Sequence, residues 1–302
     1  MTYPAVTIII LNWNGKEDTI ECLESLKQIT YPNYEILLVD NGSTDGSVEC
    51  FMKQYPEIEI IETGKNLGFA EGNNVAIRRA MDEGVDYVLL LNNDTVVDPE
   101  FLGELVKVAE GDERIGIVGP KIYYYDYKGR KDVIWFAGGT INMWTGTTLH
   151  EGENMPDSQN YGRLKEIEYA TGCAMLIKRG VIGSIGMLES AFFTYYEDVE
   201  ISFRARTDGW NIKYIPAARV WHKVSQSSGG AFSSNTVYYK ARNRIWFMRM
   251  YKSKIGYFIT ILHLLIFKQI TRFIHFAVIR RDYVLLKNYY RGIYDGITKK
   301  HH

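Results

Sequence analysis

The chain has 302 residues, of which 46% are hydrophobic and 24% are charged, and its formal net charge is −1. These ordinary values exclude a disordered, collagen-like or low-complexity protein and allow one large domain, or one domain with an appendage. Residues 230–302 contain 14 Lys and Arg residues and 2 Asp and Glu residues, whereas residues 1–229 contain 21 Lys and Arg residues and 34 Asp and Glu residues. The basic end of the chain predicts an anionic partner, either nucleic acid or a membrane surface.

The first third of the sequence alternates strand-like and helix-like segments. Short apolar, β-branched runs predict buried strands, and apolar residues three and four positions apart predict helices. The expected strands are 6–11, 34–39, 58–61, 87–91 and 115–119, and the expected helices are 16–27, 46–54, 74–82 and 99–109. This alternation favours an α/β fold, with a mostly parallel sheet, helices on both faces, and a ligand crevice at the carboxyl ends of the strands.

The rest of the chain is less regular. Residues 123–167 are rich in Gly and Tyr, and we expect irregular strands and loops there. The later predictions are strands at 169–177, 211–215 and 218–221, a helix at 197–206, and helical periodicity from residue 235 onward.

The C-terminal tail has features of a segment that lies on a membrane surface. Its apolar stretch, 255–267, has 13 residues, whereas a helix that spans a bilayer needs about 20. Lys268, Arg272, Arg280 and Arg281 then punctuate the following residues. A basic amphipathic helix in the plane of an anionic membrane fits this pattern, without a nucleic-acid partner. A C-terminal helix that only packs on the preceding domain is the alternative.

The cysteines and the N-terminus indicate where the protein works. Cys22, Cys50 and Cys173 have no paired spacing, which favours a reducing compartment over a disulfide framework or a zinc site. The first residues lack the basic and apolar regions of a secretion signal. We therefore expect a cytoplasmic protein that is peripheral on the inner face of the cell membrane, and nothing in the sequence specifies its oligomeric state.

A polar cluster follows the second predicted strand in 39–48, VDNGSTDGSV. Asp40 ends that strand, where its carboxylate would face the crevice and accept hydrogen bonds from a ribose hydroxyl or a base N–H. The alternative is a purely structural turn, in which one of residues 43–45 caps the next helix.

A second cluster ends the strand in 89–95, LLLNNDT. Asn92, Asn93 and Asp94 present oxygen atoms of the kind that bind a hard divalent cation, which would bridge the diphosphate of a nucleotide. A turn with Asx hydrogen bonds is the alternative.

The segment 192–206, FFTYYEDVEISFRAR, places Glu197 and Asp198 at the start of a predicted helix, after an aromatic run. Aromatic neighbours would desolvate a carboxylate and suit it to act as a general base, although carboxylates also favour helix N-termini for purely structural reasons. His222 follows the last predicted strand and is either a metal ligand or a structural histidine.

Taken in order, these segments resemble the family 2 glycosyltransferases of GT-A fold, and most of all their rhamnosyltransferase-like branch. The resemblance covers about residues 5–250, and it rests on seven ordered blocks: LNWNG (11–15), VDNGSTDGS (39–47), NLGFAEGNN (66–74), LLLNNDT (89–95), TGCAMLIKR (171–179), YYEDVEISFR (195–204) and RVWH (219–222). It implies an inverting transfer from a nucleotide-diphosphate sugar, with dTDP-rhamnose as the first expected donor, to a glycan or lipid-linked glycan acceptor.

The resemblance also implies roles for residues on the donor side. Asn12 and Asp40 would contact the nucleoside, and Gly68 and Asn73 would line the donor pocket. Arg242, in YYKARNR, matches a basic patch that follows the catalytic domain in many members and would also bind the donor.

The same resemblance implies the metal site and the base. Asn93 and Asp94 match the family's DxD motif, of which Asn93 is expected to touch the donor and Asp94 the cation, Mg²⁺ or Mn²⁺. The first position of that motif is Asn92 here, so His222 would help to complete the metal shell. Asp198 matches the catalytic base, with Glu197 supporting it.

These assignments divide the chain into a catalytic domain, 1–229, and a basic helical tail, 230–302. Within the first, about 1–120 would bind the nucleotide sugar and about 121–229 the acceptor.

Other functions are less compatible with the sequence. A nucleotidyltransferase needs a Gly-rich basic loop near the first strand, where LNWNGKED offers one Gly and one Lys. A dinucleotide-dependent oxidoreductase needs G-x-G-x-x-G there, and 11–15 lacks it. A non-enzymatic protein that binds membranes through the tail remains the alternative to an enzyme.

Overall fold

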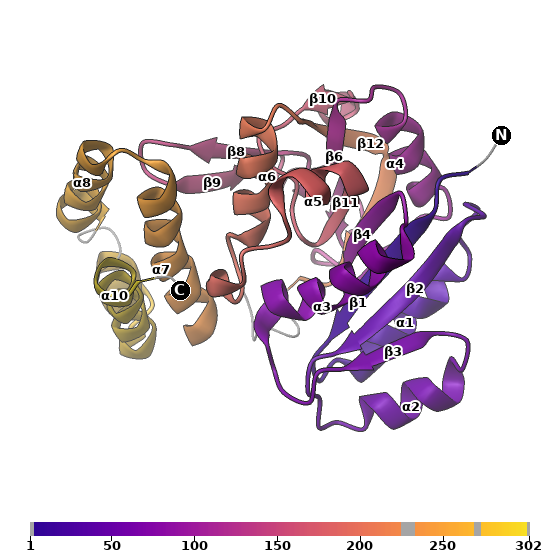
Figure 1. The fold of residues 1–302 in the computed structure, drawn as a ribbon. Helices are drawn as coiled ribbons and strands as arrows, with labels where there is room; N and C mark the ends of the chain where they lie inside the picture. Colours follow the sequence, from indigo (N-terminus) through magenta and orange to yellow (C-terminus); the bar gives the residue numbers. More distant parts are fainter. Residues whose placement is uncertain (1–2, 225–232, 269–272, 301–302) are drawn as a thin grey trace.

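The structure, a computed structural model, describes residues 3–224, 233–268 and 273–300. A twisted sheet occupies its centre (Figure 1). The strands run in the spatial order β10 (Lys165–Glu166), β12 (Asn211–His222), β6 (Ile115–Tyr124), β11 (Ala174–Lys178), β4 (Tyr87–Asn92), β1 (Val6–Asn12), β2 (Tyr34–Asp40) and β3 (Glu59–Glu62). Two short strands pair beside this path, β5 (Thr95–Val97) with β12 and β7 (Ile134–Phe136) with β6.

The sheet is parallel from β4 through β3, and antiparallel only around β11, β10 and the short strands. β1 pairs in parallel with both β2 and β4, whereas β11 runs antiparallel to β4 and β6. The central strands are almost wholly buried apolar runs, as expected for a sheet that is covered on both faces. The predicted mostly parallel α/β sheet is confirmed.

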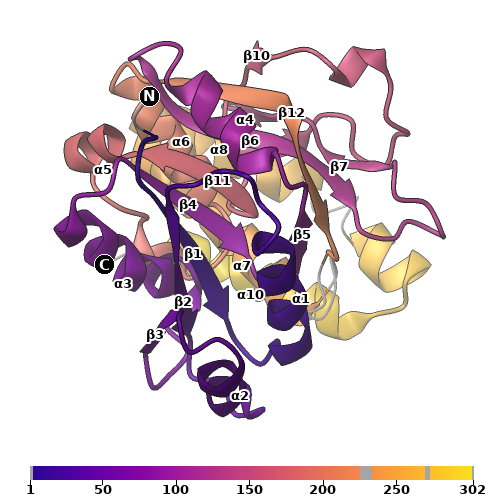
Figure 2. The same ribbon diagram turned by 90° about the vertical axis from the view of Figure 1, so that its right-hand side faces the viewer.

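Helices cover both faces of this sheet. The helices of the first two thirds are α1 (Lys16–Leu26), α2 (Ser47–Gln54), α3 (Gly68–Glu83), α4 (Phe101–Ala109), α5 (Arg179–Ile185) and α6 (Glu197–Thr207). α3, α5 and α6 lie together on one side, and α1 lies on the other (Figures 1 and 2). A separate hairpin, β8 (Gly139–Asn142) with β9 (Thr147–His150), and the short helices η1 (Gln159–Tyr161) and η2 (Ser190–Phe192) occupy the irregular region.

Several predicted boundaries were wrong. The strand expected at 169–177 begins only at Ala174, because the preceding residues turn toward α6. The two strands expected between 211 and 221 are the single strand β12, with a register irregularity between Ile215 and Arg219. Helix α3 begins six residues before the expected 74, and α5 and β5 were not predicted.

The tail is helical, as predicted, in its described parts. It consists of α7 (Ser234–Tyr251), α8 (Lys254–His263), α10 (Tyr283–Thr298) and two π-helical segments, η3 (Leu264–Lys268) and η4 (Ile274–Ile279). α7 contributes Trp246, Phe247 and Met248 to the main hydrophobic core, so this part packs on the preceding domain. The predicted boundary at residue 229 and the predicted basic residue Arg272 lie outside the described residues.

A second, smaller core joins α7 to the rest of the tail. Its buried side chains include Val237 and Ile245 of α7 and Leu285 and Ile293 of α10. The helices that contain the tail's 255–267 stretch lie at the end of the molecule that the β8–β9 hairpin reaches (Figure 1). Among the described residues, none of the helices is both long enough and apolar enough to cross a membrane.

Candidate active site

The carboxyl ends of β1 and β2 are joined by side-chain hydrogen bonds. Asn12 is completely buried, and its Nδ2 donates to Asp40 Oδ1 at 3.0 Å and to Ser43 Oγ at 3.1 Å. Asp40 Oδ2 accepts from the backbone N–H groups of Gly42 at 3.2 Å and Ser43 at 2.9 Å. The two residues predicted to contact the nucleoside therefore fix the loop that follows β2.

Asn93 belongs to the same polar network. Its Nδ2 donates to Thr19 Oγ1 at 2.9 Å and lies 3.4 Å from Asn12 Oδ1, which also accepts from Gly15 N and Thr19 Oγ1, each at 3.1 Å. A Cβ atom on Gly15 would come within 2.6 Å of Asn93 Nδ2, so only glycine leaves room for this arrangement. The structure thus brings three predicted donor residues together, and their contact with a donor stays a prediction.

Gly68 lies between this donor edge and the loop before α6. Its φ is +83°, and a Cβ atom there would come within 2.6 Å of the Phe193 carbonyl oxygen. Its own carbonyl accepts from Asn41 Nδ2 at 3.1 Å, while Phe69 N donates to Phe193 O at 2.6 Å. Asn73 is buried and donates to Phe69 O at 2.8 Å, so it supports the first turn of α3.

Asp94 and His222 form a buried pair at the end of β12. Asp94 Oδ1 lies 3.1 Å from His222 Nε2, and the two residues are 2% and 6% exposed. Burial works to raise the pKa of Asp94 and to lower the pKa of His222, but the attraction between the two charges outweighs it. As a result the pKa of Asp94 lies below its ordinary value and the pKa of His222 lies well above its own.

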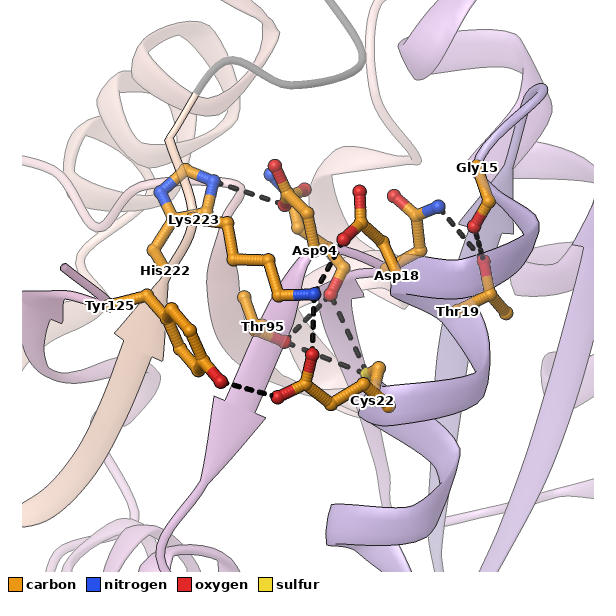
Figure 3. A network of polar contacts seen from close by, with 12 residues as sticks. Gly15, Asp18, Thr19, Cys22, Asp94, Thr95, Tyr125, His222 and Lys223 are labelled. Atoms are coloured by element: carbon orange, nitrogen blue, oxygen red, sulfur yellow. Dashed lines mark hydrogen bonds and ion pairs between the residues drawn. The ribbon is translucent and has the colours of Figure 1, made fainter.

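A second ion-pair network lies directly beside this pair (Figure 3). Lys223 Nζ lies 2.5 Å from Asp18 Oδ1 and 2.6 Å from Glu21 Oε2, and Tyr125 Oη donates to Glu21 Oε1 at 2.6 Å. Hydrogen bonds from Lys223 and Tyr125 hold the pKa of Glu21 below its usual value. The backbone N–H of Lys223 also donates to Asp94 O at 2.9 Å. This bond connects the backbone at Asp94 to the backbone that follows His222.

We did not predict this network from the sequence. Lys223 is adjacent to His222, and Asp18 and Glu21 are three residues apart on α1. That spacing places both carboxylates on one helix face, which was the available signal.

The residues of the Asp94–His222 pair suit a divalent cation. Beyond its ion pair with His222 Nε2, the buried Asp94 Oδ1 has no hydrogen-bond partner among the described residues, and His222 Nδ1 is a buried atom that makes no hydrogen bond there by geometry. A carboxylate oxygen is an ordinary ligand for Mn²⁺ or Mg²⁺, whereas an imidazole nitrogen favours a transition metal such as Mn²⁺ over Mg²⁺. In the described part of the chain no three His, Cys, Asp or Glu residues are grouped so that they could hold a metal ion together. Most of the coordination shell would therefore come from water and phosphate oxygens.

Asp198 and Glu197 begin α6 with unequal environments. Asp198 Oδ2 accepts from Gly172 N at 3.0 Å and Oδ1 from Val199 N at 2.8 Å, whereas Glu197 Oε2 is buried without a partner in the described chain. Burial raises the pKa of both carboxyl groups, and the two N–H donors limit the rise at Asp198. The charge of Asp198 raises the pKa of Glu197 further, so Glu197 retains its proton at a higher pH than Asp198 does.

Cys173 connects the metal candidate to the base candidate. Its carbonyl accepts from Asn92 N at 2.8 Å, two residues before Asp94, and the adjacent Gly172 N holds Asp198. Burial raises the pKa of the Cys173 thiol, His222 opposes the rise, and the charges of Asp94 and Asp198 add to it. Both carboxylates are therefore close enough to act electrostatically on one buried thiol.

The loop before α6 has an unusual backbone. Phe193, Tyr195 and Tyr196 have φ values of +66°, +67° and +79°, a region that non-glycine residues rarely adopt. Such backbones persist only where the surroundings hold them, and they concentrate at functional sites.

Helix α7 holds this loop in place. Asn243 Nδ2 donates to the carbonyl oxygens of Phe192, Thr194 and Tyr195 at 2.9, 2.8 and 2.7 Å, and Asn243 is completely buried. Arg242 Nη2 also donates to Phe192 O at 2.9 Å, and its guanidinium group lies 4.1 Å from the centre of the Trp246 ring.

The predicted donor-binding residue Arg242 thus contacts the loop that presents Asp198, and its contact with a donor stays a prediction. Asn243 follows Arg242 in the block YYKARNR and matches the same basic patch, but its hydrogen bonds to the loop carbonyls were not predicted from the sequence.

Comparisons with known proteins identify the family and the fold. A family model described as "Glycosyl transferase family 2" matches residues 7–186. N-acetylglucosaminyl-diphospho-decaprenol L-rhamnosyltransferase of Mycobacterium tuberculosis is 29% identical over 226 residues, which are 68% of this chain and 72% of that protein. The low-salt glycan biosynthesis hexosyltransferase Agl10 of Haloferax volcanii is 28% identical over 240 residues, which are 79% of this chain and 74% of that protein.

Solved glycosyltransferase structures share the fold. The mannosyltransferase PcManGT of Pyrobaculum calidifontis, solved with GDP-Man and Mn²⁺, superposes with a TM-score of 0.62 at 14% identity, over 99% of this chain and 89% of that one. GalNAc-T7, solved with UDP, GalNAc and Mn²⁺, gives a TM-score of 0.63 at 17% identity, over 80% of this chain and 47% of that one. The predicted GT-A fold is confirmed. The chain belongs to glycosyl transferase family 2 and is a glycosyltransferase.

Proposed function

We propose that the protein transfers a sugar, with inversion, from a nucleotide-diphosphate sugar to a hydroxyl group of a glycan or lipid-linked glycan, with Asp198 as the base. The observation that carries this proposal is the placement of Asp198 and Asp94 around Gly172 and Cys173. A base bonded to Gly172 and a candidate cation site beside the adjacent Cys173 suit a reaction in which an acceptor hydroxyl and a phosphate leaving group flank one sugar carbon.

Asp198 would remove the proton of the acceptor hydroxyl as that oxygen attacks the anomeric carbon. A positioned base of this kind contributes roughly 10²–10⁴-fold to the rate. One displacement with one base inverts the anomeric configuration. Asp198 is the member of the pair that ionises first, because Glu197 keeps its proton to higher pH.

Asp94 and His222 would hold a divalent cation, which stabilises negative charge on the oxygens of the leaving diphosphate as a Lewis acid. Asn12, Asp40 and Asn93 would set the loop that receives the nucleoside, because their side chains fix its backbone. Only the neutral imidazole of His222 is a metal ligand, so binding of the cation and protonation of His222 would compete.

The names of the relatives suggest which donor and acceptor to test first. The mycobacterial relative is named an L-rhamnosyltransferase that acts on a diphospho-decaprenol glycan. We therefore propose dTDP-rhamnose as the first donor and a polyprenyl-diphosphate glycan as the first acceptor, with other nucleotide sugars as competitors.

The test begins with a panel of nucleotide sugars in a thermal-shift assay with Mn²⁺ or Mg²⁺, because a bound ligand stabilises the native state. The best donor is then given to the wild-type enzyme with the acceptor, and the anomeric configuration of the product is determined by NMR. We expect one donor to raise the melting temperature and to yield an inverted product. A retained configuration, or diphosphate release from a nucleoside triphosphate and a sugar phosphate, would overturn the proposal.

A further inference from the structure

Helix α8 presents apolar side chains on both of its sides. On the inner side Tyr257 and Ile261, together with Leu264 at the start of η3, pack into the small core formed with α7 and α10. The outer side, which continues into η3, carries large apolar side chains that are each at least 40% exposed: Ile255, Phe258, Ile259, Leu262, Leu265 and Ile266. We call this set the α8 face. A helix that is apolar all round is normally buried in protein or placed against a membrane.

The β8–β9 hairpin places a tryptophan next to this helix. Trp144, in the hairpin turn, is 76% exposed, and its carbonyl accepts from Thr260 Oγ1 of α8 at 3.0 Å. Lys252 Nζ lies 5.5 Å from the centre of the indole ring. An exposed tryptophan beside a lysine and an apolar helix is the combination found where proteins meet the lipid–water interface.

The charges of the tail decide between two kinds of partner. The exposed basic side chains in the described part of the tail include Lys254, Arg280, Arg281, Lys287 and Arg291. The two carboxylates in the described part of the tail are engaged: Asp282 caps α10, and buried Asp295 pairs with Lys299 at 3.0 Å. A second copy would bring like charges together, whereas an anionic lipid surface attracts them.

We propose that the α8 face and Trp144 dock on an anionic lipid surface and thereby present the active site to a lipid-linked acceptor. The second half of this proposal rests on the proposed function. The hairpin turn supplies the link, because Gly146 O accepts from Tyr196 Oη at 2.7 Å and Thr145 O accepts from Arg244 Nε at 2.6 Å. Tyr196 directly precedes Glu197 and Asp198, so the turn that carries Trp144 touches the loop that holds the base.

The test measures co-sedimentation of the full chain with phosphatidylcholine vesicles that contain or lack phosphatidylglycerol. The apolar variant combines Ile255→Gln, Phe258→Gln and Ile259→Gln. Its matched control combines Met52→Gln, Met155→Gln and Leu164→Gln, which are similarly exposed apolar residues outside the tail. A charge variant combines Lys254→Ala and Arg281→Ala. Circular dichroism verifies that each variant is folded.

We expect the wild type and the matched control to pellet with anionic vesicles and to be released by high salt, because salt screens the attraction. The apolar variant should bind at least tenfold more weakly, and the charge variant about fivefold more weakly for each residue removed. Equal binding of the apolar variant and the matched control would overturn the proposal, as would a wild type that stays in the supernatant or forms a dimer through this face in sedimentation velocity.

The vesicle assay contains no sugar donor, so it is independent of the proposed function. If pelleting fails while a water-soluble acceptor is still glycosylated, only the docking proposal is lost. If pelleting succeeds, a comparison of transfer to vesicle-borne and to water-soluble acceptors tests the link between docking and catalysis. The apolar variant should then lose activity on the vesicle-borne acceptor alone, and equal loss on both acceptors would contradict that link.

Discussion

The two sides of the candidate site are built differently. On the donor side, the polar side-chain atoms of Asn12 and Asp40 form hydrogen bonds within the protein. Toward the base, Glu197 Oε2 has no partner among the described residues, and the preceding loop keeps Tyr195 and Tyr196 at positive φ. The donor side is thus held by its own side chains, whereas the base loop is held from outside by α7. We expect substitutions on the first side to alter donor affinity and stability, and substitutions on the second to alter turnover.

The largest effect that bears on this comparison should come from Asp94, which lies between the two sides. Asp94→Asn removes one partner of a buried ion pair, a loss that typically costs about 3–5 kcal/mol of stability, and it removes a carboxylate ligand. We expect the metal-dependent part of donor affinity to disappear. Calorimetric titrations of the donor with Mn²⁺ and with EDTA measure it, and Asp132→Asn, an exposed carboxylate paired with Arg130, is the control. Titrations of Asp94→Asn that still respond to Mn²⁺ like the wild type would contradict the assignment.

The next effect concerns the support of the base loop by α7. Asn243→Ala removes the Asn243 donor from the carbonyl groups of Thr194 and Tyr195, whereas Phe192 O keeps its bond from Arg242. An unsatisfied buried polar group costs about 1–3 kcal/mol. Because the loop should then relax from its rare backbone, we expect kcat to fall much more than KM for the donor rises. Steady-state kinetics measure this, with Asn235→Ala, an exposed asparagine of the same helix, as the control. A loss of stability with unchanged kcat would reduce Asn243 to a purely structural residue.

A variant of the donor side should behave in the opposite way. Asn12→Ala removes a buried amide that joins the loops after β1 and β2, so we expect a loss of about 1–3 kcal/mol of stability. The donor KM should rise, while kcat at saturating donor should stay close to wild type. Denaturant unfolding and initial rates measure the two effects. If kcat fell as steeply as in Asn243→Ala, the distinction between the two sides would not hold.

The smallest effect is a change in how stability depends on pH. Burial raises the pKa of Glu197 in the folded state above its value in the unfolded state. The stability that the neutral carboxyl contributes is therefore fully present below the unfolded-state pKa, and it is lost as the pH rises through the folded-state pKa. Glu197→Gln cannot ionise, and its melting temperature should therefore fall less than that of the wild type between acid and alkaline buffers. If the melting temperatures of the two proteins changed equally with pH, Glu197 would not be buried as a neutral group.

The sequence was informative wherever local pattern determines structure. Apolar runs such as 87–91 predicted β1, β2, β3 and β4 within one residue at each end, because a parallel sheet buries both faces of each strand. The strand predicted at 115–119 continues to Tyr124 as β6. The polar ends of those strands converge as expected, since parallel strands share one carboxyl edge. That is why Asn12, Asp40 and Asn93 could be grouped before any coordinates were known.

What the sequence did not predict depends on contacts between distant segments. Asn243 reaches its loop carbonyls across about fifty residues of chain, and no local pattern encodes such a pairing. Strand β11 was placed too early because Gly172 turns to hold Asp198, a tertiary hydrogen bond that overrides the apolar run. The tail was correctly predicted to be helical. Only the structure shows that α7 packs on the domain and that α8 keeps an exposed apolar side.

The most direct test of the account is the Asp198→Asn variant, with sugar transfer and donor binding measured on the same preparation. The substitution preserves size and removes the negative charge, so a base role predicts that the rate of transfer falls by about 10²–10⁴-fold while donor affinity stays within a few-fold of wild type. Near-normal turnover by Asp198→Asn, or an equal loss of donor binding and of transfer, would contradict the claim that Asp198 is the base.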